Sequence, residues 1–267
     1  MIRNIFTLSL LSLSLFSYNT YADIAIPEQP GLNLPINRNP EPEPEPQQQQ
    51  PVNNDPQQQT GQEQQAQAPN SFKEGTDYIL IKPAVPPENS NTIQVINFFS
   101  YNCKPCYQVN QTLQNWSMDM PYYVKLINSP VAANIQTAYP VRIYFSLEKI
   151  GATNLNTALL KASAEGDLNL QDYKEYPKLK NWLINRQINI KDFETAFDSG
   201  EVIAKVTTSP TIVKQYNIDT IPALSIDGRY LVPPSVLLEP TKAKQVINYL
   251  VNRASQEKMK ARQNGDL

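Results

Sequence analysis

The chain has 267 residues, with 23 prolines and only 8 glycines, and its formal net charge is −2. This nearly neutral charge, with no run of Lys and Arg interleaved with aromatic residues, argues against a protein that binds the phosphate backbone of nucleic acids. The complete lack of histidine removes the commonest metal ligand and the base of every imidazole-dependent catalytic triad.

Residues 1–22 have the pattern of a secretory signal peptide. Arg3 supplies a positive charge, residues 5–16 are largely apolar, and a small-residue cleavage site ends at Ala22. The apolar stretch is about a dozen residues long, shorter than the roughly 20 that a membrane-spanning helix needs. We therefore expect cleavage after about Ala22 and export to the periplasm, with a retained membrane anchor as the alternative.

Residues 23–71 are rich in proline and glutamine, which make up 22 of these 49 residues. The segment includes an acidic Glu-Pro repeat at 41–46 and almost no aromatic residues, so it cannot bury enough apolar surface to fold. It carries a charge of −6, from one arginine and seven acids, against +3 for the residues that follow. We expect a disordered, extended linker. Whether it is an inert spacer or a docking tail stays open.

From residue 72 onward, the pattern predicts one α/β domain with a buried central sheet. Runs at 78–81 and 94–99 are expected to be strands, and the second is almost continuously apolar, which is typical of a strand covered on both faces. Apolar residues at helical spacing follow Cys103, so a strand turns into a helix there. The next strand is predicted at 122–127.

A mostly helical region is predicted between residues 130 and 216. Its helices are expected at 132–150, with a break at Pro140, and at 155–164, 179–185, 192–199 and 208–216. Because this region interrupts an α/β pattern, we expect it to be an insertion in the sheet domain.

After the insertion, the sequence predicts a β-hairpin over 223–232. Its turn is Asp227-Gly228, since Asp-Gly supplies the positive φ angles of tight hairpin turns. A single apolar face over 243–254 predicts a final helix that covers the sheet, with a polar end beyond Gln256 that frays.

The chain has only two cysteines, Cys103 and Cys106, separated by Lys104 and Pro105. A disulfide between them closes a very short loop, which adds little stability to a domain of this size. Zinc needs about four Cys or His ligands, and covalent haem needs a histidine after the second cysteine, where this chain has Tyr107. We therefore favour redox chemistry over a structural role, and expect no metal and no cofactor.

The position of Cys103 at a helix N-terminus favours a thiolate, because free backbone N–H groups and the helix dipole stabilise negative charge there. Lys104 adds a positive charge. The pair can then exchange with a client through a mixed disulfide, which Cys106 is placed to resolve. Lys104, Tyr101 and Tyr107 are expected to rim the site, with the edge of the core as the alternative for the two tyrosines.

Three short sequences resemble the opening of a DsbA-family thiol:disulfide oxidoreductase. They are Gly75-Thr76-Asp77-Tyr78, Phe98-Phe99-Ser100-Tyr101 and Cys103-Lys104-Pro105-Cys106-Tyr107. Ile221-Pro222, followed by the predicted hairpin, is similar to the family's cis-proline strand. The resemblance spans roughly residues 72–251 and implies a thioredoxin-like fold with an inserted helical domain. It also implies that the Ile221–Pro222 bond is cis and faces the cysteines, where nearby backbone can pair with a client peptide.

The same resemblance implies a protein disulfide oxidoreductase that introduces disulfides into exported client proteins with cysteines. The implied catalytic residues are Cys103 and Cys106, and the implied supporting residues are Lys104, Pro105, Ile221 and Pro222. A membrane quinone reductase of the DsbB type is the implied recycling partner. No dimerisation segment is recognisable, so we expect a monomer.

Three positions depart from the typical oxidase of the family. The family usually has Pro-His between the cysteines, so an imidazole that helps to stabilise the thiolate is missing, and Pro105 matches thioredoxin instead. Asn97 stands where the family usually has a buried acid, and Ile221 is also thioredoxin-like. Because a less stable reduced form makes a weaker oxidant, we expect a less oxidising pair than is typical of the family.

Two alternatives to client oxidation stay open. Pro105 and Ile221 fit a periplasmic disulfide reductase or isomerase with a more reducing pair, which would be found mostly reduced in the cell envelope. A non-redox binding module or chaperone would instead hold clients in the groove near Pro222 and on the acidic linker. That protein would keep its function after Cys103→Ser.

Overall fold

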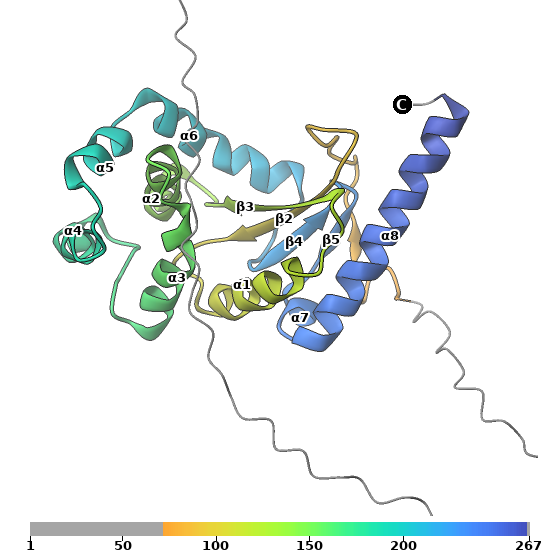
Figure 1. Cartoon of the computed structure of the whole chain (residues 1–267), viewed down its shortest axis with the longest axis horizontal. Helices are drawn as coiled ribbons and strands as arrows, with labels where there is room; N and C mark the ends of the chain where they lie inside the picture. The colour runs from red at the N-terminus through yellow and green to blue at the C-terminus, as the bar shows by residue number, and fades with distance from the viewer. Residues whose placement is uncertain (1–71, 266–267) are drawn as a thin grey trace, which may run out of the picture. The chain divides into compact units, whose positions relative to one another are not determined.

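The computed structural model describes residues 72–265 (Figure 1). The signal peptide predicted at 1–22 and the linker predicted at 23–71 therefore lie outside the described residues. Within the part that is described, no helix is both long and apolar enough to cross a bilayer. The strands form one mixed sheet in the order β1-β5-β4-β2-β3. They are β1 (Ile79–Leu80), β2 (Ile93–Phe99), β3 (Val124–Pro130), β4 (Ala223–Ile226) and β5 (Tyr230–Val232).

Most helices among residues 72–265 lie between β3 and β4. The α-helices are α1 (Lys104–Ser117), α2 (Tyr139–Lys149), α3 (Asn156–Glu165), α4 (Tyr176–Ile184), α5 (Ile190–Phe197), α6 (Gly200–Gln215), α7 (Pro234–Leu237) and α8 (Pro240–Asn264). The short 3-10 helices are η1 (Ile135–Thr137), η2 (Thr153–Leu155) and η3 (Tyr173–Glu175). The stretch from η1 to α6 is the helical insertion, and it separates the first strands of the sheet from the last two.

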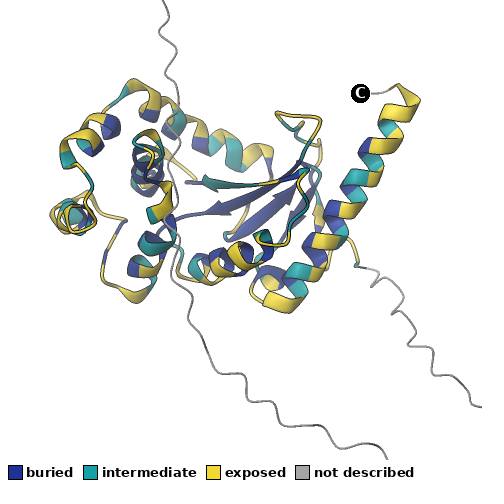
Figure 2. Ribbon diagram, in the orientation of Figure 1, coloured by how far each residue is buried: buried dark blue, intermediate teal, exposed yellow. Residues whose placement is uncertain are grey.

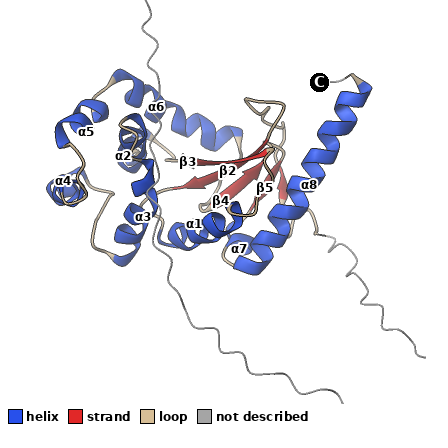
Figure 3. Ribbon diagram, viewed as in Figure 1, coloured by secondary structure: helices blue, strands red, loops and turns tan. Residues whose placement is uncertain are grey.

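Helices cover both faces of the sheet (Figure 3). On one face, α1, α7 and α8 pack over Val95 of β2 and Leu224 of β4. On the other face, the C-terminal part of α6 packs over Ile96 and Phe98. All of β2 is therefore buried (Figure 2), as its continuous apolar character predicts.

Strand β2 determines where the cysteine pair lies. It runs parallel to β3, with Ile93 opposite Val124, and antiparallel to β4, with Phe98 opposite Ala223. The chain leaves the end of β2 and enters α1 after a short turn. The first turn of α1 is thus placed at the end of β2 where β4 begins.

Helix α6 is longer than the sequence predicts. It begins at Gly200, whereas the predicted helix begins at residue 208. Ser199 caps its first turn, because the Ser199 hydroxyl oxygen accepts a hydrogen bond from the Val202 N–H (3.4 Å). Pro210 lies inside the helix without ending it. The prediction was wrong here because it followed the later apolar run and missed the cap.

Helix α8 also continues past the point where the polar sequence predicts fraying. Lys258 is only 5% exposed, and its ammonium group donates hydrogen bonds to the Asp227 carboxylate and the Thr92 carbonyl, both at 2.7 Å. This buried ion pair holds the last turns of α8 against the β4–β5 hairpin. The prediction of a frayed end beyond Gln256 is therefore wrong.

Several smaller boundaries differ from the prediction. The strand predicted at 122–127 starts later, as β3, and Tyr122 is 98% exposed outside it. The helix predicted at 132–150 starts only after η1, and Pro140 lies in the first turn of α2, where a missing N–H needs no partner. Pro140 therefore begins this helix and does not break it. The helices predicted at 155–164, 179–185 and 192–199 are present as α3, α4 and α5.

Candidate active site

Cys103 and Cys106 lie where β2 leads into α1, and they form a disulfide with an S–S distance of 2.00 Å. Cys103 is the N-cap residue of α1 and is partly exposed. Cys106 lies in the first turn of the helix and is 1% exposed. A client sulfur can therefore reach Cys103, whereas Cys106 is enclosed by the protein.

The local sequence explains why α1 begins at the cysteine pair. The Cys103 N–H donates a hydrogen bond to the Ser100 carbonyl (3.0 Å), and the Cys106 N–H donates one to the Cys103 carbonyl (3.0 Å). Pro105 lies in the first turn, where its missing N–H leaves no bond unmade. That turn contains no acidic residue, and Lys104 is exposed within it. The local field therefore favours negative charge on Cys103.

The second predicted motif lies beside the first. The Ile221–Pro222 bond is cis, as the resemblance implies, and it leads directly into β4. Ile221 lines a cavity of about 430 Å³ together with Cys103, Lys104 and Pro105. Residues more than a hundred positions apart in the sequence are thus brought to one surface.

The sequence analysis missed the segment that forms the other wall of this cavity. Val131, Ala132 and Ala133 line it, directly after β3. The Ser209 hydroxyl of α6 accepts a hydrogen bond from the Ala132 N–H (2.8 Å), so this segment is fixed by a side chain of the helical insertion. A serine in the middle of a helix gives no signal of such a contact in the sequence.

The two tyrosines that were expected at the rim have different positions. Tyr101 is 1% exposed and packs edge-on against Phe99, with 5.6 Å between ring centroids. Burial raises the pKa of Tyr101 well above its usual value. The prediction that Tyr101 rims the site is therefore wrong, and its alternative, a place in the core, holds. Tyr107 is partly exposed on α1, and its hydroxyl accepts a hydrogen bond from Gln111 (3.1 Å).

Asn97 lies inside β2, six residues before Cys103, and is 1% exposed. Its side-chain NH₂ donates a hydrogen bond to the Asn128 side-chain oxygen (3.0 Å). Its own side-chain oxygen has no hydrogen-bond partner among the described residues. An amide does not titrate, so this position offers a buried acceptor without a buried charge.

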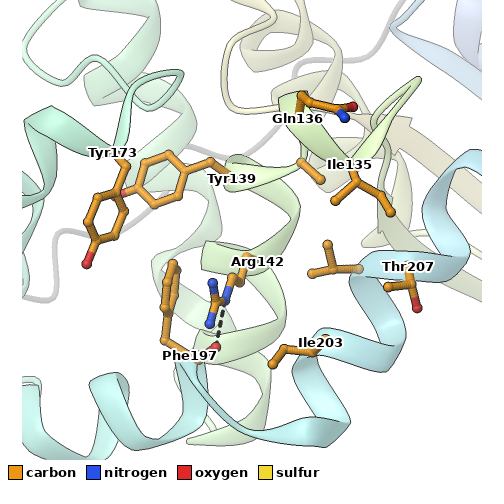
Figure 4. Close-up of a pocket in the computed structure, with 10 residues that line it drawn as sticks. Ile135, Gln136, Tyr139, Arg142, Tyr173, Phe197, Ile203 and Thr207 are labelled. Carbon is orange, nitrogen blue, oxygen red and sulfur yellow. Dashed lines mark hydrogen bonds between the residues drawn. The ribbon is translucent and has the colours of Figure 1, made fainter.

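A separate cavity of about 410 Å³ lies in the helical insertion, between α2 and α6 (Figure 4). Apolar side chains such as Ile135 and Ile203 line much of it, and Arg142 stacks on the Phe197 ring, 3.9 Å from its centroid. No cysteine lines this cavity, so it is not part of the candidate redox site. Residues 72–265 also contain no group of His, Cys, Asp or Glu that could hold a metal ion.

Comparison with known proteins gives consistent relatives, although no family model matches the chain. The thiol:disulfide interchange protein DsbA of Bordetella parapertussis is 26% identical over 157 residues, which cover 59% of this chain and 74% of that protein. The DsbA protein of Pseudomonas syringae pv. tomato is 24% identical over 189 residues, covering 70% of this chain and 87% of that protein.

Solved structures show the same fold. The oxidoreductase DsbA of Xylella fastidiosa matches with a TM-score of 0.62 at 21% identity, over 69% of this chain and 98% of that one. Pseudomonas aeruginosa DsbA matches with a TM-score of 0.62 at 18% identity, over 70% and 96% of the two chains. Together, the curated relatives and the shared thioredoxin-like fold support a thiol:disulfide oxidoreductase that is similar to DsbA proteins.

Proposed function

We propose that this protein introduces disulfides into exported client proteins, with Cys103 as the cysteine that clients attack and Cys106 as the resolving cysteine. The observation that carries the proposal is the asymmetry of the pair. Cys103 is accessible at a helix N-terminus beside the cis-proline loop, and Cys106 is buried. Such an arrangement suits sequential exchange better than a structural bridge, because only one sulfur meets solvent.

A client dithiol is oxidised by the cysteine pair in two thiol–disulfide exchange steps. A client thiolate attacks the Cys103 sulfur, the bond between the two cysteines of the pair breaks, and Cys106 leaves as a thiolate that takes up a proton. A second client thiolate then attacks the client sulfur of the mixed disulfide, and Cys103 leaves as a thiolate. The client is oxidised by two electrons, and the cysteine pair is reduced by two.

The supporting residues act through charge and shape. The positive charge of Lys104 favours the leaving thiolate of Cys103, and Pro105 fits the first helical turn without an unpaired N–H. Pro222 lacks an N–H and leads directly into β4, where the backbone beside it is proposed to pair with an extended client segment. Ile221 offers an apolar wall next to Cys103.

The site of action that we propose is the periplasm, supported by the signal-peptide pattern at 1–22. Re-oxidation needs an electron acceptor, because each client leaves the pair reduced. A membrane quinone reductase of the DsbB type fills this role. We propose a monomer, since one chain carries both cysteines and the cis-proline loop.

The redox state of the pair in cells tests the direction of the reaction. Acid-quenched extracts are treated with a thiol-reactive reagent of high mass, and the two forms are separated on a gel. An oxidase is expected to be found mostly as the disulfide. A mostly reduced pair would instead support the reductase or isomerase, which Pro105 and Ile221 favour by their likeness to thioredoxin.

A further inference from the structure

Buried oxygens without hydrogen-bond partners gather near the cysteine pair. Among residues 72–265, nine buried side-chain oxygens lack a partner. Three of them belong to Asn97, Tyr101 and Asn102, all within six residues of Cys103. Native structures rarely leave buried polar atoms unpaired, because desolvation is then uncompensated. The oxidised form therefore holds acceptors that another state of the site can satisfy.

Asn97 lies on the face of the sheet that α1 covers. Side chains alternate along a strand, so Asn97 shares its face with Val95 and Phe99. Val95 packs in one apolar cluster with Val109 of α1, and Phe99 packs in another with Cys106, one helical turn earlier. Asn97 lies between Val95 and Phe99 on this face of β2, and from this placement we infer that its side chain lies beneath the first turn of α1.

Reduction of the cysteine pair creates a hydrogen-bond donor, the Cys106 S–H group, beneath the first turn of α1. In the disulfide, Cys106 has no hydrogen on sulfur, whereas the reduced Cys106 carries an S–H that needs an acceptor in a site that is 1% exposed. The Asn97 amide is oriented by its bond to Asn128, which uses the NH₂ group and leaves the oxygen free.

We propose that the Asn97 side-chain oxygen accepts the hydrogen bond of the Cys106 thiol in the reduced protein. This inference rests on the proposed function, since it concerns the same cysteine pair. When a client dithiol reduces the pair, two electrons break the S–S bond. One proton ends on Cys106, Cys103 is released as a thiolate, and the second client proton passes to solvent. The new bond stabilises the reduced state only.

A more stable reduced state makes the disulfide a stronger oxidant. Asn97 thereby compensates in part for the missing imidazole between Cys103 and Cys106. The compensation needs no charge, which suits a position buried inside β2.

The test is the equilibrium constant of the full chain with glutathione, read by trapping free thiols. Asn97→Ala is expected to shift the equilibrium about five- to tenfold toward the disulfide, and tenfold corresponds to about 30 mV. Asn128→Ala breaks the same side-chain hydrogen bond but keeps the acceptor. Ser225→Ala removes another unpartnered buried oxygen, on the opposite face of the sheet. Ser225→Ala is expected to change the equilibrium less than twofold, and Asn128→Ala, which loses only the orientation of the amide, to shift it less than Asn97→Ala does.

Asn97→Asp keeps an acceptor oxygen and is expected to leave the pair at least as oxidising as in the natural chain. It also serves as the test if Asn97→Ala does not fold. The inference is overturned if Asn97→Ala shifts the glutathione equilibrium less than twofold. It is also overturned if Asn128→Ala shifts the equilibrium as much as Asn97→Ala does, or if Asn97→Asp shifts it toward the disulfide. A pair found reduced in cells would refute client oxidation, yet the glutathione equilibria would still decide the role of Asn97.

Discussion

The buried ion pair between Lys258 and Asp227 allows a sharp test of how the C-terminal helix is held. The Asp227 side chain is fully buried, and Arg229 approaches it only to 3.7 Å. Replacing one partner of a buried pair leaves an uncompensated charge, which typically costs about 3 to 5 kcal/mol. We therefore expect Lys258→Met to lower the free energy of unfolding by about 3 kcal/mol.

The pH dependence of this variant has a definite sign. Burial raises the pKa of Asp227 above its usual value, and Lys258 opposes that rise. Without Lys258 the pKa of Asp227 rises further above its value in the unfolded chain. A carboxyl with a raised folded-state pKa destabilises the fold when it is ionised. The loss of stability in Lys258→Met is therefore full at neutral pH, and it shrinks as pH falls through the folded-state pKa of Asp227.

Urea unfolding of the oxidised protein, followed by tryptophan fluorescence between pH 7 and pH 4, measures both effects. Lys260→Met is the matched control, because Lys260 lies two residues further along the same helix and is exposed. Its expected effect is within about 0.5 kcal/mol. A loss below about 1 kcal/mol in Lys258→Met, or a loss that grows as pH falls, would refute the reasoning.

Two further predictions concern the cysteine pair. Cys106→Ser should accumulate mixed disulfides with clients through Cys103, whereas Cys103→Ser should form few, because the remaining Cys106 is buried; non-reducing gels of envelope extracts show the difference. Lys104→Glu places a negative charge beside the thiolate and should shift the glutathione equilibrium about threefold or more toward the disulfide. Lys104→Gln should fall between it and the natural chain, and an unchanged equilibrium in both would exclude a role for this charge.

Local patterns predicted the parts of the fold that depend on neighbouring residues. The continuous apolar run before Cys103 identified the central strand, and the Asp227-Gly228 turn identified the hairpin, with positive φ angles at both residues. The C-terminal end of the last helix was missed, because its stability comes from a contact between Lys258 and a hairpin 31 residues away. No pattern within the helix shows that contact.

In the candidate site, too, the sequence predicted residues within short motifs and missed those that depend on distant contacts. The spacing of the cysteines and the resemblance around Pro222 identified Lys104, Pro105 and Ile221, which line one cavity with Cys103. The wall formed by Ala132 was missed, because it depends on a hydrogen bond that the Ala132 N–H donates to the Ser209 hydroxyl, 77 residues later. Tyr101 was placed wrongly at the rim, since a tyrosine next to a surface loop can point either way. Packing against Phe99 in the folded protein determines that the Tyr101 side chain points into the core.

The lack of histidine leads to one more prediction, on how the redox equilibrium depends on pH. With no imidazole in the chain and an amide at Asn97, the site has neither a histidine nor a carboxylate at position 97 whose protonation could couple to the two thiols. The potential should fall by about 60 mV per pH unit while both thiols are protonated on reduction, and by about 30 mV once Cys103 stays a thiolate. When the potential is measured from pH 5 to pH 8 in glutathione buffers, its slope against pH should therefore change once.

In Asn97→Asp, a buried carboxyl is added beneath Cys106, and a second change of slope, or bend, is expected. Two bends in the natural chain would mean that another group is coupled to the pair, and the oxidising power could not then be attributed to the helix terminus, Lys104 and Asn97.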